Sequence, residues 1–150
     1  MDKKQFVPKD FVIPPVLETE DFRLRMLSVD DVEKDYEAVM ETQERFLGLG
    51  YGWPREGFTI EENLADLEWH QREFLHREAF AYTVVSLDES RVLGCVYINP
   101  PKQEGADAII WLWVREREYQ KGLDPILFRE VKNWIDKEWP FRMVIYPQRE

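Results

Sequence analysis

Apolar and charged residues alternate near the start of the chain, which is the pattern of a strand with one buried face. Phe22, Leu24 and Met26 occupy every second position of residues 22–26, and arginines stand between them, so the apolar side chains point the same way. Four later segments are continuously apolar and rich in β-branched and aromatic residues: 80–87, 92–98, 108–114 and 141–146. The polar residues 88–90 join the first two of these as a hairpin. The sequence therefore predicts five strands.

Three other segments repeat apolar residues every three or four positions, which is the spacing of an amphipathic helix. They cover about 29–41, 60–77 and 123–140. The first two begin with capping sequences, Ser28-Val29-Asp30-Asp31 and Thr59-Ile60-Glu61-Glu62, in which a hydroxyl accepts from the first free backbone N–H groups. The order of elements is therefore β-α-α-β-β-β-α-β.

This order predicts a mixed α/β (α+β) domain with a central, mostly antiparallel sheet. Consecutive strands with short connections favour an antiparallel meander, and the final strand–helix–strand unit favours a parallel crossover. Residues 1–20 carry three of the nine prolines (Pro8, Pro14 and Pro15) and no helical period. We expect an extended arm there, because proline fixes φ and removes a hydrogen-bond donor. Residues 21–150 form the single domain expected for a chain of this length.

The charge of the chain argues against two classes of partner. Lys and Arg total 20 against 30 Asp and Glu, a formal net charge of −10. Binding to nucleic acid or to an anionic membrane needs clustered positive charge, so neither is expected. The chain has no apolar run long enough to cross a membrane, no signal-peptide pattern, and one cysteine, Cys95, which cannot form an intramolecular disulfide. We expect a soluble cytoplasmic protein.

The sequence lacks the common phosphate, metal and nucleophile motifs. It has no P-loop, HExxH, CxxC or G-x-S-x-G pattern. His70 and His76 are six positions apart on a predicted helix and point to different faces, so no metal site is expected. Cys95 lies inside an apolar strand without a cation nearby in sequence, which predicts a packed core thiol.

The most informative stretch is the point where a strand ends, a charged turn follows and a glycine precedes a helix. It reads Trp111-Leu112-Trp113-Val114-Arg115-Glu116-Arg117-Glu118-Tyr119-Gln120-Lys121-Gly122-Leu123-Asp124. Here the chain resembles the GNAT-type acyltransferases, a family with a branch that acts on the N-termini of ribosomal proteins. The order of elements over roughly residues 20–147 resembles that family as well.

The resemblance implies a fold in which acyl-CoA lies between two splayed strands, here 108–114 and 141–146. The family binds the pyrophosphate of CoA in a loop of the form Arg/Gln-x-x-Gly-x-Gly/Ala, through backbone N–H groups and the following helix N-terminus. Matched onto residues 119–124, Gly122 takes the central glycine position. The resemblance thus implies acetyl-CoA as a co-substrate. Its binding residues are then Trp113, Val114, Arg115, Lys121, Gly122, Leu123 and Asp124.

Three positions depart from the family's pattern. Asp124 stands where the family has a small residue, and with Pro125 after it Asp124 is predicted to cap the helix. Its charge would repel a pyrophosphate at the positive end of the helix. Ile109 stands where the ribosomal-protein branch often has an acidic general base. The family's tyrosine that protonates the departing thiol lies beyond the last strand, where this chain is expected to stop short, so Tyr146 is the nearest substitute for that catalytic role.

In GNAT-type proteins the acceptor pocket is lined by the second helix and the loop before it. The matching loop, residues 48–58, is rich in glycine and aromatic residues and is predicted to be mobile. The apolar stripe of the helix comprises Ile60, Leu64, Leu67, Phe74 and Leu75. The opposite side then carries Trp69, Arg72 and His76, which with Trp53 of the loop are the substrate-binding candidates. Alternatively, this helix packs on both sides, or Trp69 makes a dimer contact, and His70 is a core-border histidine.

Two functions follow from these observations. The first is an acyl-CoA-dependent N-acetyltransferase that acts on a small amine or a peptide N-terminus, with no metal. The alternative is a catalytically inactive domain of the same fold that binds another ligand or a protein partner, which Asp124 and Ile109 favour. A more remote reading is a structural homodimer formed through exposed tryptophans.

Overall fold

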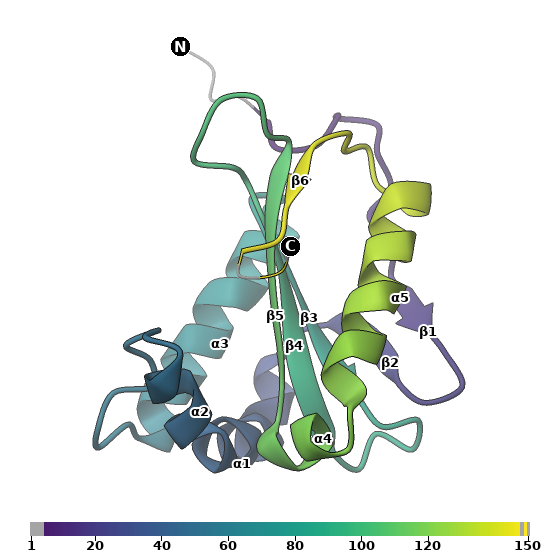
Figure 1. The fold of residues 1–150 in the computed structure, drawn as a ribbon. Coiled ribbons are helices and arrows are strands. Elements are labelled where there is room, and N and C mark those ends of the chain that lie inside the picture. Colours follow the sequence, from purple (N-terminus) through teal and green to yellow (C-terminus); the bar gives the residue numbers. More distant parts are fainter. Residues whose placement is uncertain (1–4, 148, 150) are drawn as a thin grey trace.

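One sheet runs through the molecule and separates its helices into two layers (Figure 1). The computed structural model describes residues 5–147 and 149. Within them the strands lie in sequence order: β1 (Val16–Glu18), β2 (Arg23–Met26), β3 (Phe80–Val85), β4 (Val92–Asn99), β5 (Ala108–Val114) and β6 (Val144–Ile145). Neighbours are antiparallel except β5 and β6, which are parallel. The predicted fold class is confirmed, and β1 is an additional strand.

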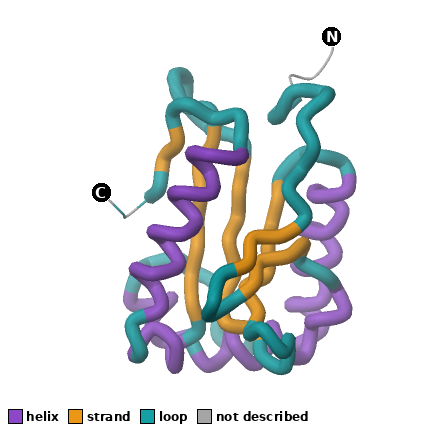
Figure 2. The backbone as a smooth tube through the Cα atoms, turned by 90° about the vertical axis from the view of Figure 1, so that its right-hand side faces the viewer, coloured by secondary structure: helices purple, strands orange, loops and turns teal. Residues whose placement is uncertain are grey.

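Helices cover both faces of this sheet, as Figures 1 and 2 show. On one face lie α1 (Val32–Glu41), which follows the 3-10 turn Val29–Asp31, α2 (Gln43–Gly48) and α3 (Ile60–Leu75). On the other face lies α5 (Leu123–Glu138), which the short α4 (Glu116–Gln120) connects to β5. The sequence did not predict α2 and α4, because such short helices show no clear period. None of the helices in the described residues is long and apolar enough to cross a membrane.

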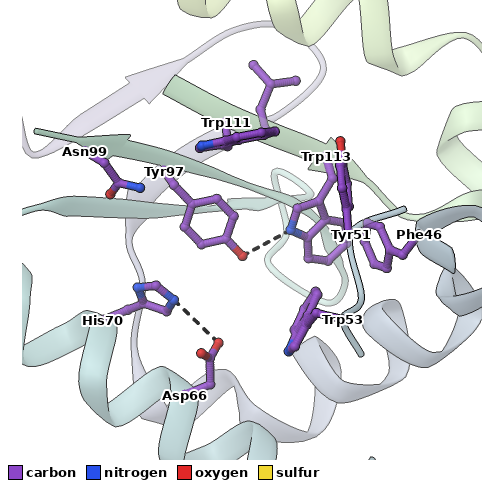
Figure 3. Close-up of a pocket in the computed structure, with 10 residues that line it drawn as sticks. Phe46, Tyr51, Trp53, Asp66, His70, Tyr97, Asn99, Trp111 and Trp113 are labelled. Atoms are coloured by element: carbon purple, nitrogen blue, oxygen red, sulfur yellow. Dashed lines mark hydrogen bonds and ion pairs between the residues drawn. The ribbon is translucent and has the colours of Figure 1, made fainter. Parts of the chain in front are cut away.

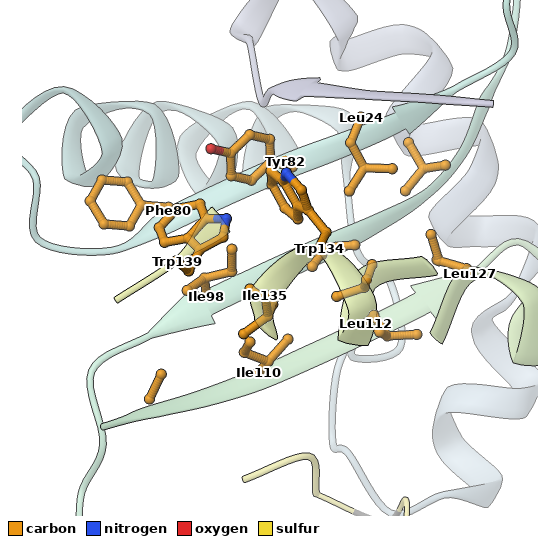
Figure 4. Close-up of a cluster of buried hydrophobic side chains, with 14 of the residues drawn as sticks. Leu24, Phe80, Tyr82, Ile98, Ile110, Leu112, Leu127, Trp134, Ile135 and Trp139 are labelled. Carbon is orange, nitrogen blue, oxygen red and sulfur yellow. The ribbon is translucent and has the colours of Figure 1, made fainter. Parts of the chain in front are cut away.

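The larger core lies between the sheet and α5 (Figure 4). Helix α5 buries residues three and four positions apart, which is the spacing of one helix face: Leu127, Val131, Trp134 and Ile135. The rings of Trp134 and Tyr82 meet edge to face, with centroids 5.0 Å apart. The Tyr82 hydroxyl donates to the Pro14 carbonyl at 2.6 Å, so the N-terminal segment is tied to β3.

A smaller core lies on the opposite face, beneath α1, α2 and α3. It contains Val39, Phe46, Leu67, Cys95 and Trp113. The Cys95 side chain is fully buried, and this burial raises the pKa of its thiol. The prediction that Cys95 is a packed core thiol is confirmed, because a thiol without access to solvent is not available as a nucleophile.

Helix α3 is rotated relative to the predicted apolar stripe. Leu64 and Leu75 are exposed, so the prediction that they face the core is wrong. The fully buried positions are Asn63 and Leu67, and Asp66 and His70 follow on the inward side, where both line a cavity. Polar residues on the buried side of a helix shift the apparent stripe, because hydrophobicity alone does not mark them.

The strands β5 and β6 are paired only where they begin. The parallel register joins Ala108 to Val144 and Ile109 to Ile145, and the predicted strand 141–146 is reduced to these two positions. In Figure 2 the chain leaves the sheet after β6. The remaining edge of β5 therefore has no partner strand in the described part of the chain, which is the splayed arrangement that the resemblance implied.

Candidate functional site

A helix N-terminus lies beside the open edge of β5. Gly122 is the N-cap of α5 and has a φ of +89°, a left-handed conformation that glycine adopts without steric cost. A Cβ built at this position would meet no atom within 4 Å. The first N–H groups of a helix have no partner within the helix. Backbone donors therefore stand next to open space at this end of α5, where the family resemblance implied a pyrophosphate site.

Asp124 lies in the first turn of α5, where Arg149 neutralises it. Nη1 and Nη2 of Arg149 donate to the two carboxylate oxygens at 2.7 and 2.8 Å. Nη2 also lies 3.5 Å from the Leu112 carbonyl on the open edge of β5. The prediction that Asp124 caps the helix is wrong: the cap is Gly122, and the carboxylate is engaged in a tertiary ion pair instead.

Of the predicted positive charges, Arg115 points into the protein. Its side chain is only 2% exposed, and its guanidinium donates to Glu37 and Glu41, each at 2.8 Å, and to the Val92 carbonyl at 3.0 Å. A hydrogen bond from Arg115, against a smaller effect of burial, lowers the pKa of Glu41 to about 2. Arg115 therefore ties α1 to the sheet. It does not point toward the splay, by which we mean the space between the unpaired edge of β5 and the chain that follows β6.

The other predicted cofactor-binding residues lie around the two ends of α4. Lys121 is exposed and approaches Glu118 at 3.5 Å, and Leu123, the first residue of α5, is buried in the larger core. The Val114 carbonyl accepts a hydrogen bond from Arg45, while Trp113 faces the smaller core. The structure thus brings Gly122, Asp124 and the end of β5 together and adds Arg149, which the sequence did not single out.

Tyr146 directly follows β6, at the point where the strands diverge. Its ring packs edge to face on Phe128 of α5, with centroids 5.1 Å apart. Its hydroxyl is buried and has no hydrogen-bond partner in the described residues. Burial raises the pKa of this hydroxyl, so Tyr146 carries its proton at neutral pH.

A cavity of about 390 Å³ opens on the other face of β5 (Figure 3). Residues from α2, the following loop, α3, β4 and β5 line it: Phe46, Tyr51, Trp53, Asp66, His70, Tyr97, Asn99, Trp111, Leu112 and Trp113. Trp111 and Trp53 stand on opposite sides of the opening in Figure 3. The cavity and the splay are therefore adjacent, because β5 contributes to both.

The polar side of this cavity is an imidazole between two carboxylates. His70 lies 3.5 Å from Asp66 through Nε2 and 3.4 Å from Glu73 through Nδ1. Burial disfavours the charged imidazole, but the two carboxylates outweigh it and raise the pKa of His70. Nearby, Trp113 Nε1 donates to the Tyr97 hydroxyl at 3.1 Å, which fixes both rings in the wall.

Among the four substrate-binding candidates, Trp53 lines the cavity and the other three lie outside it. Trp69, 54% exposed, carries the Arg72 guanidinium over its ring at 5.4 Å, and His76 is also exposed. The sequence missed the pair Tyr97 and Trp111, which are directly opposite each other on β4 and β5. The sequence did contain a signal for the polar side of the cavity. Asp66, His70 and Glu73 are four and three positions apart, so their side chains share one face of α3.

A buried carboxyl, that of Asp35, lies behind this wall. Asn63 Nδ2 donates to Asp35 Oδ2 at 2.9 Å, while the Asn63 side-chain oxygen has no partner among the described residues. Burial, reinforced by Asp66 and Asp31 and opposed by the Asn63 hydrogen bond, raises the pKa of Asp35 to about 6. In the described residues no group of three or more His, Cys, Asp or Glu is arranged to hold a metal ion.

Acetyltransferases are among the solved structures with a similar fold. The ribosomal-protein-S5-alanine acetyltransferase from Vibrio fischeri superposes with a TM-score of 0.68 at 19% identity, over 90% of this chain and 76% of the other. The ribosomal L7/L12 α-N-protein acetyltransferase RimL in complex with coenzyme A gives 0.70 at 15% identity, over 87% and 73%. The microcin C7 self-immunity acetyltransferase MccE, in complex with acetyl-CoA and AMP, gives 0.64 at 15%, over 83% and 68%.

The similarity is confined to three-dimensional structure. No protein-family model matches the sequence, and no curated protein sequence matches it either. Identities of 15–19% are too low to carry an activity from one protein to another, because one fold hosts many functions. The mostly antiparallel sheet, the splay after β6 and the glycine before α5 together show that the chain has the GNAT fold.

Proposed function

We propose that the protein is an acyl-CoA-dependent N-acetyltransferase whose acceptor is a small amine or a peptide N-terminus. The observation that carries this proposal is the divergence of β5 and β6 after Ile109 and Ile145 next to the helix start at Gly122. An unpaired strand edge offers hydrogen bonds to an extended amide-containing chain such as pantetheine. A helix N-terminus beside it suits the pyrophosphate at the other end of the same molecule.

Two features of the splay support the binding of acetyl-CoA. Open space at Gly122 lets a phosphate approach the backbone N–H groups of α5, and Arg149 balances the charge of Asp124. In this proposal the edge around Trp113 and Val114 holds pantetheine, and the segment Lys121–Asp124 with Arg149 surrounds the pyrophosphate. Acetyl-CoA, when bound, supplies the activated acyl group.

The chain's own residues then have three tasks. The aromatic cavity holds the acceptor on the far side of β5 and excludes water, so that the amine and the acyl group meet with little loss of entropy during the reaction. Asp66 is the one carboxylate among the residues that line that cavity, so it is the proposed acceptor of the ammonium proton. The neutral amine then attacks the thioester carbonyl and the carbon–sulfur bond breaks. Tyr146 keeps its proton and has no competing hydrogen bond in the described residues, so it is the proposed donor to the departing sulfur.

The test is calorimetric titration with acetyl-CoA. We expect one site per chain with a dissociation constant between about 1 μM and about 1 mM. Asp124→Asn removes a negative charge and frees Arg149, so it should tighten binding by about three- to tenfold. Glu61→Gln, which removes a first-turn acid at α3, is the matched control and should leave binding unchanged.

One observation favours a second function. Arg115 is buried in ion pairs and Asp124 occupies Arg149, so within residues 5–147 and 149 neither arginine offers free positive charge to the splay. If neither the wild type nor Asp124→Gly binds acetyl-CoA, the proposed activity is wrong and the chain is a ligand-binding domain on the same fold. If acetyl-CoA does bind, mass spectrometry after incubation with small amines and with peptides beginning in alanine or serine identifies the class of acceptor.

A further inference from the structure

The cavity at Trp53 and Trp111 has the composition of a cation site. Six of its ten lining residues are Phe, Tyr or Trp, one is a carboxylate, and none is Lys or Arg. We propose that this cavity binds a small aliphatic ammonium ion, with its alkyl groups against the aromatic rings and Asp66 as its counter-ion. The binding of the ion does not depend on the proposed function. Only its role as the acceptor of the acetyl group rests on that function.

The aromatic walls are arranged before any ligand arrives. Phe46 packs against Trp53 and Trp113 with ring centroids 5.5 and 5.3 Å apart, and Tyr51 meets Trp111 at 5.9 Å. Rings fixed in this way lose little freedom on binding. The face of each ring carries negative potential, so several rings around one space attract a cation more strongly than a neutral group of the same shape.

The charges around the cavity also favour an ammonium ion. His70 stands between Asp66 and Glu73, so this group of three is net negative even when the imidazole is protonated. The net charge of the chain, −10, acts in the same direction. An anionic ligand would therefore be repelled here, whereas an ammonium ion replaces the lost hydration with one carboxylate and several ring faces.

The shortage of polar groups favours a small ion over a peptide. An amine with an ordinary pKa near 10 reaches the site as an ammonium ion, which the Asp66 carboxylate can accept. A bound peptide also brings backbone N–H and C=O groups that each need a partner. Of the polar side chains here, His70 faces two carboxylates and the Tyr97 hydroxyl accepts from Trp113. The Asn99 amide is then the main remaining partner for the backbone groups of a peptide.

The test compares two probes of the same shape that differ in charge. Choline and 3,3-dimethylbutan-1-ol are titrated separately into the protein without acetyl-CoA, with tryptophan fluorescence and calorimetry as readouts. We expect choline to bind at least about tenfold more tightly than the neutral alcohol. Equal binding of the two, or no binding of choline, would overturn the proposal without any variant being needed.

Three variants locate the site. Trp111→Leu and Asp66→Asn should each weaken choline binding about tenfold, since one removes a ring face and the other the counter-ion. Trp69→Leu is the matched control, because Trp69 is an exposed tryptophan outside the cavity, and it should bind choline as the wild type does. An equal loss in Trp69→Leu contradicts the proposed location, and circular dichroism checks that each variant is folded.

Three further titrations, with acetyl-CoA, AMP and a peptide beginning in alanine, separate this inference from the proposed function and from other ligands. Choline binding without acetyl-CoA binding supports the cation site and contradicts the acetyltransferase. Acetyl-CoA binding without preference for choline over the alcohol overturns the cation site alone. Binding of AMP or of the peptide that is tighter than that of choline and is weakened by Trp111→Leu also overturns it.

Discussion

At the scale of single residues, Asp35 is the clearest case of a group held against its ordinary chemistry. Burial raises its pKa to about 6, so the folded protein resists ionising it while the unfolded chain ionises near its usual value of 3.8. The resulting penalty is absent below pH 3.8, grows as the pH rises and is complete above pH 6. It amounts to about 3 kcal/mol at most, since one pKa unit corresponds to about 1.4 kcal/mol.

Asp35→Asn should therefore stabilise the protein at neutral pH. The amide cannot ionise, it still accepts from Asn63, and its own NH₂ group can donate to the Asn63 oxygen, which has no partner among the residues that the structure describes. Urea unfolding at about pH 8 should show a gain of about 1–3 kcal/mol over the wild type that shrinks toward about pH 4. Asp136→Asn, the same change at an exposed position, should show no such trend. A constant difference at every pH would contradict the argument.

Tyr146 gives a second prediction at this scale. Tyr146→Phe removes a hydroxyl that has no partner in the described residues, so the free energy of unfolding should change little or rise. If the hydroxyl donates a proton to the departing thiol, kcat should fall about 10- to 100-fold while the affinity for acetyl-CoA stays the same. Tyr36→Phe, which removes a hydroxyl bonded to the Phe58 carbonyl outside the cavity and the splay, is the matched control and should leave kcat unchanged. Unchanged kcat in Tyr146→Phe would remove Tyr146 from the mechanism.

The sequence predicts which apolar side chains are buried better than it predicts the partners of polar side chains. The strand at Phe22–Met26 and the burial of Cys95 follow from alternation and apolar context, which are local properties. The pairing of Asp124 with Arg149 spans 25 positions, and no local rule describes it, so a good helix-capping residue was assigned the wrong role. Long-range contacts decide the roles of polar residues more often than those of apolar ones.

At the scale of elements, the start of α5 depends on one backbone conformation. Gly122→Ala would place a Cβ at a φ of +89°, and because no neighbouring atom interferes, the cost is conformational strain of about 1 kcal/mol. Acetyl-CoA should then bind more weakly, since the N–H groups of α5 shift. Gly48→Ala, at an open position at the end of α2 without positive φ, should be neutral or stabilising. Equal effects of the two substitutions on binding would contradict a special role for Gly122.

The sequence predicts the ends of the helices and strands around the candidate site better than it predicts which of their faces point inward. Helix α3 was predicted with nearly correct ends, but its inward face was misassigned, because Asn63, Asp66 and His70 are polar residues on the inward side. The cavity adds rings from α2, β4 and β5, and their meeting depends on tertiary packing. Polar residues turned inward are the positions at which hydrophobic patterns fail, and here they lie at the site.

At the scale of the whole molecule, the net charge of −10 should act in opposite directions on the two proposed ligands. The protein's field attracts an ammonium ion and repels the phosphates of acetyl-CoA, and salt screens both effects over a Debye length of about 10 Å at about 0.1 M. Raising NaCl from about 20 to about 300 mM should therefore weaken choline binding and strengthen acetyl-CoA binding, each by about two- to fivefold. Calorimetry at both salt concentrations measures the two changes. If raising the salt concentration weakens the binding of both ligands, Arg149 and the start of α5, rather than the overall charge, dominate the field at the splay.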